Sequence, residues 1–375
     1  MESQHRLDGL DVWRGIAALM VAMYHFNVNS LIHDIFLIKN SWLFVEFFFV
    51  LSGFIMMYTY SGKILTKEQL NLFLFKRFSR IWPLHIFILL LFVPVALAGY
   101  FIGSLDSARF SFSAFASNIF LVQSLGLNDG VTWNSPSWSI SSEFWVYVAF
   151  GILNLSITKG VLRFIVVSLT CLAILFAFSN MGDAYKLAFF RCGYSFFLGC
   201  VVFYFFKCNK IRSGTLVEAL SLLSVLILMS CFYIDGDDFF AYFMPILFCF
   251  MIFAFARGHG RVSGLINNRF LIKLGKFSYS IYMTHAFVAI CIKSCLLILG
   301  KLLHQNYLLK IGNETQIDLG NPMANNVIDI LFILIVISLS SFTYKYIESN
   351  VQKRLNLWYR DKTTTDTNDP QKGFF

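Results

Sequence analysis

Ten apolar runs, each close to 20 residues long, constrain this chain more than any other feature of its sequence. They lie at 13–30, 41–60, 81–103, 139–158, 161–179, 187–206, 215–234, 239–256, 277–299 and 327–347. A helix needs about 20 apolar residues to cross the hydrocarbon core of a bilayer. Because hydrophobic residues make up 57% of the chain and charged residues only 14%, an ordinary soluble domain is excluded. The sequence predicts an all-α, polytopic integral membrane protein with about ten transmembrane helices.

The distribution of positive charge predicts how these helices are oriented. If the loops alternate sides from a cytoplasmic N-terminus, 22 of the 30 Lys and Arg residues fall on the cytoplasmic side. That bias is the one that orients membrane proteins. A further span at 113–125 would invert every later loop, so we expect this run not to cross. Both termini are therefore predicted to be cytoplasmic. The net charge of +9 is assigned to orientation in the membrane, and no nucleic-acid partner is expected.

The domain organisation follows from the same pattern. We expect one transmembrane domain over residues 1–360 and a disordered cytoplasmic tail over 361–375, which is poor in apolar residues. Two outer segments, 104–138 and 300–326, are polar enough to be solvent-exposed. The first run is interpreted as an uncleaved span and not as a signal peptide, because charged residues interrupt it. The eight cysteines show no metal-binding spacing, so they are interpreted as apolar packing residues and no metal site is expected.

Two ionisable residues interrupt the first span. Arg14 and His25 are eleven residues apart, which places them on one face of a helix and about 16 Å apart along its axis. An ionisable residue inside a membrane helix marks a functional site by default, and histidine is suited to moving a proton near neutral pH. A structural His25 and an Arg14 that snorkels to the interface are the alternative interpretations.

Four further motifs carry polar side chains into apolar runs. In "FKRFSRIWPLH", Arg77 and Arg80 share one helical face and could grip a phosphate, or anchor the helix at the interface. Pro83 is expected as an early residue of the following helix. In "WSISSEF", Glu143 lies one turn inside the run. The other candidate side chains are Ser52 in "FFFVLSGFIM"; Trp138, Ser139 and Ser142 beside Glu143; and Tyr279, Tyr282 and His285 in "LGKFSYSIYMTH". The small pair Ser52-Gly53 also predicts close helix packing.

Taken together, and in this order along the chain, the five motifs resemble those of the membrane-bound acyltransferase-3 family, whose members O-acylate sugars and other extracytoplasmic acceptors. The resemblance covers the first four spans and the ninth, and it implies a bacterial inner-membrane enzyme. This chain differs from larger members of the family, because no C-terminal hydrolase-like domain lies within the 375 residues.

The resemblance implies acyl-CoA, with acetyl-CoA expected, as co-substrate, and a surface polysaccharide or lipid-linked glycan as acceptor. By this analogy His25 and Glu143 are catalytic, and Arg14, Arg77 and Arg80 bind acyl-CoA. The acceptor or the tunnel would be lined by Ser52, Trp138, Ser139, Ser142, Tyr279, Tyr282 and His285. His25 would act as a general base or would carry the acyl group itself, and the sequence does not separate these routes.

Two other classes of protein compete with this interpretation. A glycan transporter or flippase explains intramembrane charges equally well, but transporters often contain internal repeats, and none is visible here. A membrane scaffold leaves the five motifs unexplained. Besides the donor and the acceptor, membrane lipid is the expected partner.

Overall fold

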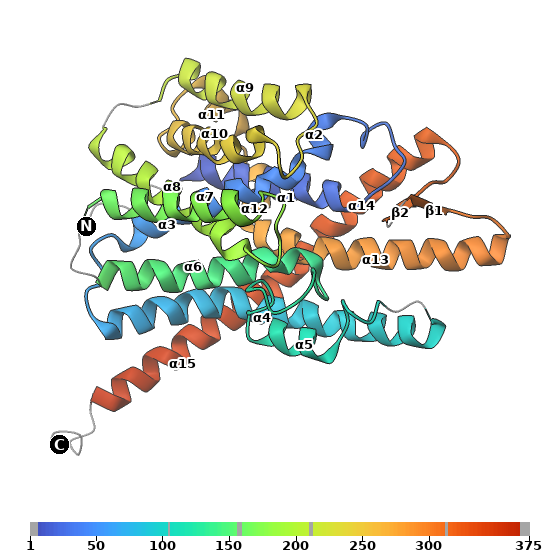
Figure 1. Cartoon of the computed structure of the whole chain (residues 1–375), viewed down its shortest axis with the longest axis horizontal. Coiled ribbons are helices and arrows are strands. Elements are labelled where there is room, and N and C mark those ends of the chain that lie inside the picture. Colours follow the sequence, from blue (N-terminus) through green and yellow to red (C-terminus); the bar gives the residue numbers. More distant parts are fainter. Residues whose placement is uncertain (1–6, 104–105, 156–159, 210–212, 312–313, 368–375) are drawn as a thin grey trace.

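The computed structural model describes residues 7–103, 106–155, 160–209, 213–311 and 314–367. In these ranges the chain is almost entirely helical, which confirms the all-α prediction (Figure 1). Each predicted apolar run overlaps one long helix. These helices are α1 (Asp8–His25), α3 (Phe44–Tyr60), α4 (Lys67–Ile102), α6 (Trp138–Leu155), α7 (Leu162–Phe178), α8 (Ala188–Cys208), α9 (Thr215–Cys231), α10 (Phe239–Ala256), α13 (Ser278–Leu303) and α14 (Pro322–Thr343).

Shorter elements connect the long helices. They are α2 (Phe36–Lys39), a 3₁₀ turn η1 (Ser41–Leu43), α5 (Phe112–Ile119), a 3₁₀ turn η2 (Ser135–Ser137), α11 (Arg261–Ile266), α12 (Arg269–Lys276), a π-helical turn η3 (Tyr344–Ser349) and α15 (Asn350–Thr367). Strands β1 (Leu308–Ile311) and β2 (Glu314–Ile317) form one antiparallel hairpin.

Six helical stretches of the described chain are long and apolar enough to cross a membrane. They are Ser41–Tyr60, Lys67–Ile102, Ala188–Cys208, Phe239–Ala256, Ser278–Leu303 and Pro322–Asp361. Helices α7 and α9 are apolar but shorter, and α1 and α6 carry Arg14 and Glu143. The protein is therefore a membrane protein, while the count of ten spans and the cytoplasmic location of both termini stay predictions.

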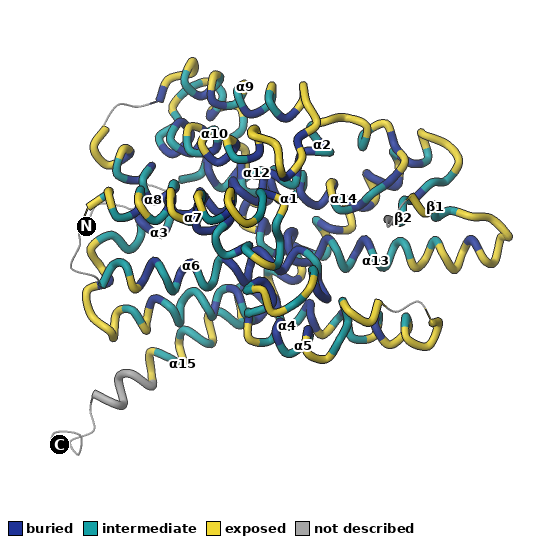
Figure 2. The backbone as a smooth tube through the Cα atoms, viewed as in Figure 1, coloured by how far each residue is buried: buried dark blue, intermediate teal, exposed yellow. Residues whose placement is uncertain are grey.

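The burial pattern fits a bundle in lipid. Buried backbone concentrates where the helices meet, and exposed residues follow the outer helix faces and the loops (Figure 2). Large apolar side chains are among the exposed ones, for example Phe101, Phe176 and Phe239, each at least 75% exposed. An extended apolar surface of this kind is expected to face a membrane.

Glycines permit a very close crossing of α3 and α8. A Cβ atom placed on Gly53 of α3 would lie 1.8 Å from the carbonyl oxygen of Phe196, and one on Gly199 of α8 would lie 1.9 Å from that of Val50. No side chain fits at either distance, so only glycine permits this approach. The close packing predicted at Ser52-Gly53 is confirmed, and it fixes α3, which carries Ser52, against α8.

Helix α4 corrects one prediction. It runs without interruption from Lys67 to Ile102 and contains Pro83 in its interior, so no new helix begins there. Neighbouring helices can satisfy the backbone groups that a proline frees in a membrane helix. Thirty-six residues make a helix about 54 Å long, well beyond the hydrocarbon thickness of about 30 Å. Arg77 and Arg80 therefore lie on the same continuous helix as the third apolar run and not on a separate helix before it.

The outer segment 104–138 also differs from its prediction. Much of its described part is buried, including Asn118 and Asn134. His85 of α4 contacts the carbonyl oxygen of Asn118 at 2.9 Å, and the Asn134 amide donates to the carbonyl oxygen of Met283 at 3.1 Å. Full solvent exposure is therefore wrong for this segment, because helices distant in sequence supply hydrogen-bond partners for its polar groups.

Helix α15 continues the chain to Thr367, past the predicted domain boundary at residue 360. Residues 368–375 lie outside the described residues. The division into a domain of 1–360 and a disordered tail of 361–375 stays a prediction.

Candidate active site

A cavity of about 550 Å³ lies among α1, α3, α4, α6 and α13. Helices that are distant in sequence bring eight of the predicted site residues into its wall. These are Arg14, Ser52, Arg77, Arg80, Ser139, Glu143, Tyr279 and Tyr282. The remaining four, His25, Trp138, Ser142 and His285, do not line this cavity.

Three arginines line the cavity, Arg14 from α1 and Arg77 and Arg80 from α4. Arg14 Nη1 lies 3.2 Å from Asp11 Oδ1, and Arg77 Nη2 donates to the hydroxyl of Tyr60 at 3.3 Å. Within the described part of the chain, Arg80 forms no hydrogen bond or ion pair, and the buried Nε of Arg77 has no partner. Unused guanidinium donors beside a cavity are suited to a phosphate-bearing ligand, because their fork geometry matches phosphate oxygens.

A chain of hydrogen bonds crosses the cavity wall from α6 to α3. The Tyr147 hydroxyl donates to Glu143 Oε1 at 2.6 Å, and it lies 2.7 Å from Ser52 Oγ. Because Tyr147 has one hydroxyl hydrogen and gives it to Glu143, Ser52 donates to the tyrosine oxygen. The structure thus connects Glu143 to Ser52 through Tyr147, and no hydrogen bond among the described residues joins Glu143 to His25.

Tyr282 lines the cavity and contacts one of the two histidines. Its hydroxyl lies 2.8 Å from Ser139 Oγ and donates to the carbonyl oxygen of Pro136 at 3.1 Å. Its ring contacts the His285 ring, with 5.7 Å between centroids, and the His285 ring lies 5.1 Å from that of His25. A continuous series of ring contacts therefore runs from Tyr282 in the cavity lining through His285 to His25.

Backbone contacts fix the tautomer of both histidines. His25 Nδ1 lies 3.0 Å from the carbonyl oxygen of Val21, and His285 Nδ1 lies 3.2 Å from that of Ile281. A carbonyl oxygen only accepts, so each Nδ1 carries the hydrogen and each neutral ring has its lone pair on Nε2. His285 Nε2 is buried and has no partner among the described residues. Each Nε2 atom thus has a lone pair that can accept a hydrogen bond.

Trp138 and Ser142 have other contacts. Ser142 Oγ lies 2.9 Å from Ser124 Oγ, which ties α6 to the outer segment. Trp138 covers the guanidinium of Arg191 at 4.7 Å from the ring centroid, and Trp42 lies near the same guanidinium at 5.3 Å. Both predicted lining residues therefore support the scaffold around the cavity in this structure.

Comparison with known proteins decides the family. The sequence model of the acyltransferase domain, acyltransferase type 3, matches residues 7–345. The chain belongs to the acyltransferase-3 family. It is also similar to protein 2 in the picA locus of Rhizobium radiobacter, with 29% identity over 162 residues that cover 38% of this chain and 78% of that protein. No solved structure matches the chain. The protein is therefore a membrane acyltransferase, and the residues described above are its candidate active site.

Two further polar residues were not predicted from the sequence, Tyr147 in the lining of this acyltransferase site and Glu348 outside that lining. Tyr147 is four residues after Glu143, a spacing that places both on one helix face and could have revealed it. Glu348 is buried on the π-helical turn η3, where it accepts a hydrogen bond from Ser280 Oγ at 2.8 Å and lies close enough to Arg80 and Arg14 to attract their charges. Its position at the end of an apolar run resembled that of an ordinary loop charge.

A buried ion pair lies beside Trp138, and breaking it is expected to lower the stability of the protein strongly. Arg191 Nε donates to Glu46 Oε1 at 2.6 Å, and Ser195 Oγ donates to the other carboxylate oxygen. We expect Glu46→Ala to lower the free energy of unfolding by about 3–5 kcal/mol, because it leaves the Arg191 charge buried without compensation. Thermal unfolding of the purified protein in detergent measures the loss. Glu46→Gln keeps an oxygen that faces Arg191 and should lose less, and equal loss in both variants would contradict this account.

Proposed function

We propose that this acyltransferase moves an acyl group, acetyl by family habit, from cytoplasmic acyl-CoA to a hydroxyl of an extracytoplasmic or lipid-linked glycan. The observation that carries the proposal is the cavity, which is lined by three arginines and by Tyr282, whose ring contacts the His285 ring of the His285–His25 pair. The arginines would bind the phosphates of the coenzyme, and the histidine pair would accept the proton of the acceptor hydroxyl. On this proposal the enzyme resides in a bacterial inner membrane.

The dimensions of α1 support a CoA thioester as the donor. Arg14 and His25 lie on the same helix about 16 Å apart. This length is comparable to an extended pantetheine arm. Phosphates held by Arg14, Arg77 and Arg80 would therefore allow the thioester to reach past Tyr282 to the histidine pair.

The chemistry proposed for His25 is general base catalysis. Nε2 removes the proton from the acceptor hydroxyl as the hydroxyl oxygen attacks the thioester carbonyl carbon. The carbon–sulfur bond then breaks, the ester forms, and the proton passes from His25 to the leaving thiolate to give free CoA. If His25 instead carries the acyl group, labelled protein accumulates when donor is supplied without acceptor, and acid quenching within one turnover detects it.

An assay in vesicles tests the proposed function. Purified protein in lipid vesicles receives labelled acetyl-CoA and polysaccharide extracted from cells that lack the protein. We expect label on the polysaccharide in an ester linkage, with one CoA released for each ester formed. Passage of unmodified polysaccharide across the membrane without CoA release would overturn the proposal and favour a transporter. Mass spectrometry of polysaccharide from cells with and without the protein then identifies the acylated hydroxyl.

A further inference from the structure

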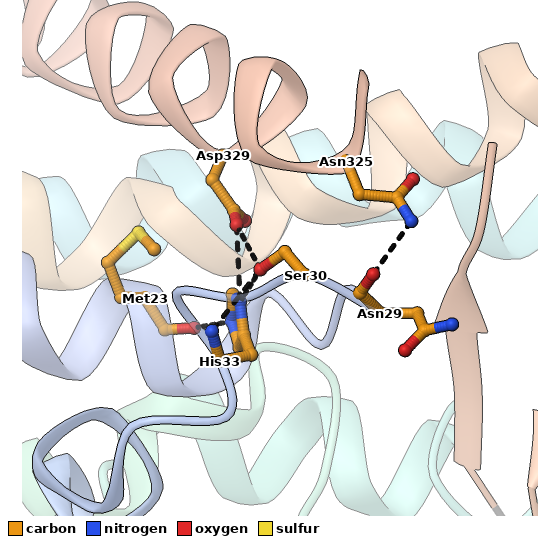
Figure 3. A network of polar contacts seen from close by, with 6 residues as sticks. All are labelled: Met23, Asn29, Ser30, His33, Asn325 and Asp329. Atoms are coloured by element: carbon orange, nitrogen blue, oxygen red, sulfur yellow. Dashed lines mark hydrogen bonds and ion pairs between the residues drawn. The ribbon is translucent and has the colours of Figure 1, made fainter. Parts of the chain in front are cut away.

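A polar cluster outside the cavity lies directly after the last turn of α1. Ser30 and His33 belong to the segment between α1 and α2, and Asp329 projects from α14 toward both (Figure 3). Ser30 Oγ donates to Asp329 Oδ2 at 2.6 Å, and His33 Nδ1 lies 3.0 Å from Ser30 Oγ and 3.3 Å from Asp329 Oδ2. Asp329 is only 1% exposed, and its Oδ1 has no partner among the described residues.

This Ser–His–Asp group is not arranged as a nucleophilic triad. In a triad the histidine accepts the serine hydrogen on one nitrogen and contacts the carboxylate through the other. Here the serine gives its hydrogen to the carboxylate, and His33 Nε2 faces the backbone carbonyl of Met23 at 2.9 Å (Figure 3). His33 contacts both Ser30 and Asp329 through the same nitrogen, Nδ1, so the carboxylate does not lie on the far side of the imidazole from the serine, and the cluster has another role.

The contact with Met23 shows what that role is. A carbonyl oxygen only accepts, so Nε2 of His33 donates to it. The same carbonyl accepts the backbone N–H of Phe26 at 3.1 Å and therefore belongs to the final turn of α1. His25 lies in this turn, two residues after Met23. The imidazole of His33 thus replaces the missing next turn of the helix and holds the backbone that carries His25.

One face of α14 fastens the whole segment. Asn325 Nδ2 donates to the carbonyl oxygen of Asn29 at 2.7 Å, Asp329 contacts Ser30 and His33, and the Phe332 ring stacks on Phe26 at 3.9 Å. Asn325, Asp329 and Phe332 follow helical spacing and are all buried.

The loop before α14 also contacts this segment, through Asp318. Hydrogen bonds from the side chains of Asn325 and Asn29 hold the pKa of Asp318 below its ordinary value, so this carboxylate stays charged and holds both amides at neutral pH. The backbone after α1 is thus anchored to α14 and to the loop before it.

We propose that His33 and Asp329 are positioning residues that fix the His25 imidazole for acyl transfer. The inference rests on the proposed function, because it assigns these residues an effect on the step that His25 performs. His33 and Asp329 do not line the donor cavity, so they act through the backbone of α1 and not through the donor. A shift of about 1 Å in a catalytic group can cost about 100-fold in rate.

Two nearly isosteric variants separate the contacts of His33. His33→Gln places an amide nitrogen near the position of Nε2 and keeps a donor for the Met23 carbonyl. His33→Asn places its amide near Nδ1, keeps the contact with Ser30 and Asp329, and loses Met23. We expect kcat to fall about 100-fold in His33→Asn and clearly less in His33→Gln, with the KM for acetyl-CoA unchanged in both. His259→Ala is the matched control, because it removes an exposed histidine that also contacts a backbone carbonyl, that of Arg257.

Asp329→Asn provides the second measurement and should lower kcat without raising the KM for acetyl-CoA. Equal losses in His33→Gln and His33→Asn, a rise in donor KM that matches the fall in kcat, or full activity of His33→Asn would each overturn the positioning role. His25→Ala in the same assay keeps the two proposals apart. If His25→Ala is inactive and His33→Asn fully active, only the positioning role fails. If His25→Ala remains active, the role proposed for His25 itself fails.

Discussion

Replacing His25 by alanine is expected to lower kcat for acyl transfer by about 10²- to 10⁴-fold, the usual contribution of a general base. The KM for acyl-CoA should stay unchanged, because His25 does not line the cavity that contains the arginines. Initial rates of CoA release and of ester formation, measured with protein in vesicles, give both constants. Near-normal transfer by this variant would remove the basis for the proposed mechanism.

A second substitution distinguishes lost chemistry from lost structure. His25→Asn keeps a side-chain donor near the position of Nδ1, where the imidazole contacts the carbonyl oxygen of Val21 at 3.0 Å, but it has no group at the position of Nε2. We expect it to unfold at the same temperature as the unmodified protein and to be as inactive as His25→Ala. Substantial activity in His25→Asn would show that the Nε2 lone pair is not the base.

The helical architecture was predictable because one physical requirement dominates it. A membrane helix must satisfy its backbone polar groups by hydrogen bonds within a single apolar segment, so each apolar run indicates one helix, although not its ends. The structure differs from the predictions where contacts between residues distant in the chain decide the fold. The outer segment folds inward because His85 and Met283 provide partners for Asn118 and Asn134, and nothing local in its polar sequence indicates these contacts.

The candidate site shows the same division. Arg14, Arg77, Arg80 and Glu143 were selected because a charge in an apolar run needs a cavity or a partner, and the structure brings all four to one cavity. The place of Tyr282 between this cavity and His285 depends on how α13 packs against α1 and α3, and helix spacing does not define it. The predicted roles of these residues stay predictions until the variants are measured.

The position of Glu348 in the C-terminal region was unpredictable for a different reason. Glu348 faces inward because η3 adopts a π-helical turn, which changes the face on which each later residue lies. A 3.6-residue periodicity applied through this region assigns the side chain to the wrong face. After an irregular turn of this kind, helical periodicity therefore does not predict which carboxylate is buried.

Arg80→Ala is expected to raise the KM for acetyl-CoA by about 10- to 100-fold, the cost of one hydrogen bond to a charged group, with a much smaller effect on kcat. Arg80 lines the cavity and, within the described residues, forms no hydrogen bond or ion pair, so apart from its effect on the donor the substitution removes only its attraction to the buried Glu348. Arg80→Lys keeps the charge without the fork geometry, and its KM for acetyl-CoA should lie between those of the unmodified protein and Arg80→Ala. Steady-state rates over a range of acetyl-CoA concentrations measure each effect.

A donor without phosphates tests whether Arg80 acts on the phosphates of CoA. S-acetylpantetheine retains the thioester and the arm, so unmodified protein and Arg80→Ala should use it equally poorly if Arg80 acts on phosphate. Lys76→Ala removes a positive charge from the same helix outside the cavity lining and should leave the KM for acetyl-CoA unchanged. A deficit of Arg80→Ala that persists with S-acetylpantetheine, or an equal deficit in Lys76→Ala, would show that Arg80 contributes to the fold or to the general field and not to phosphate recognition.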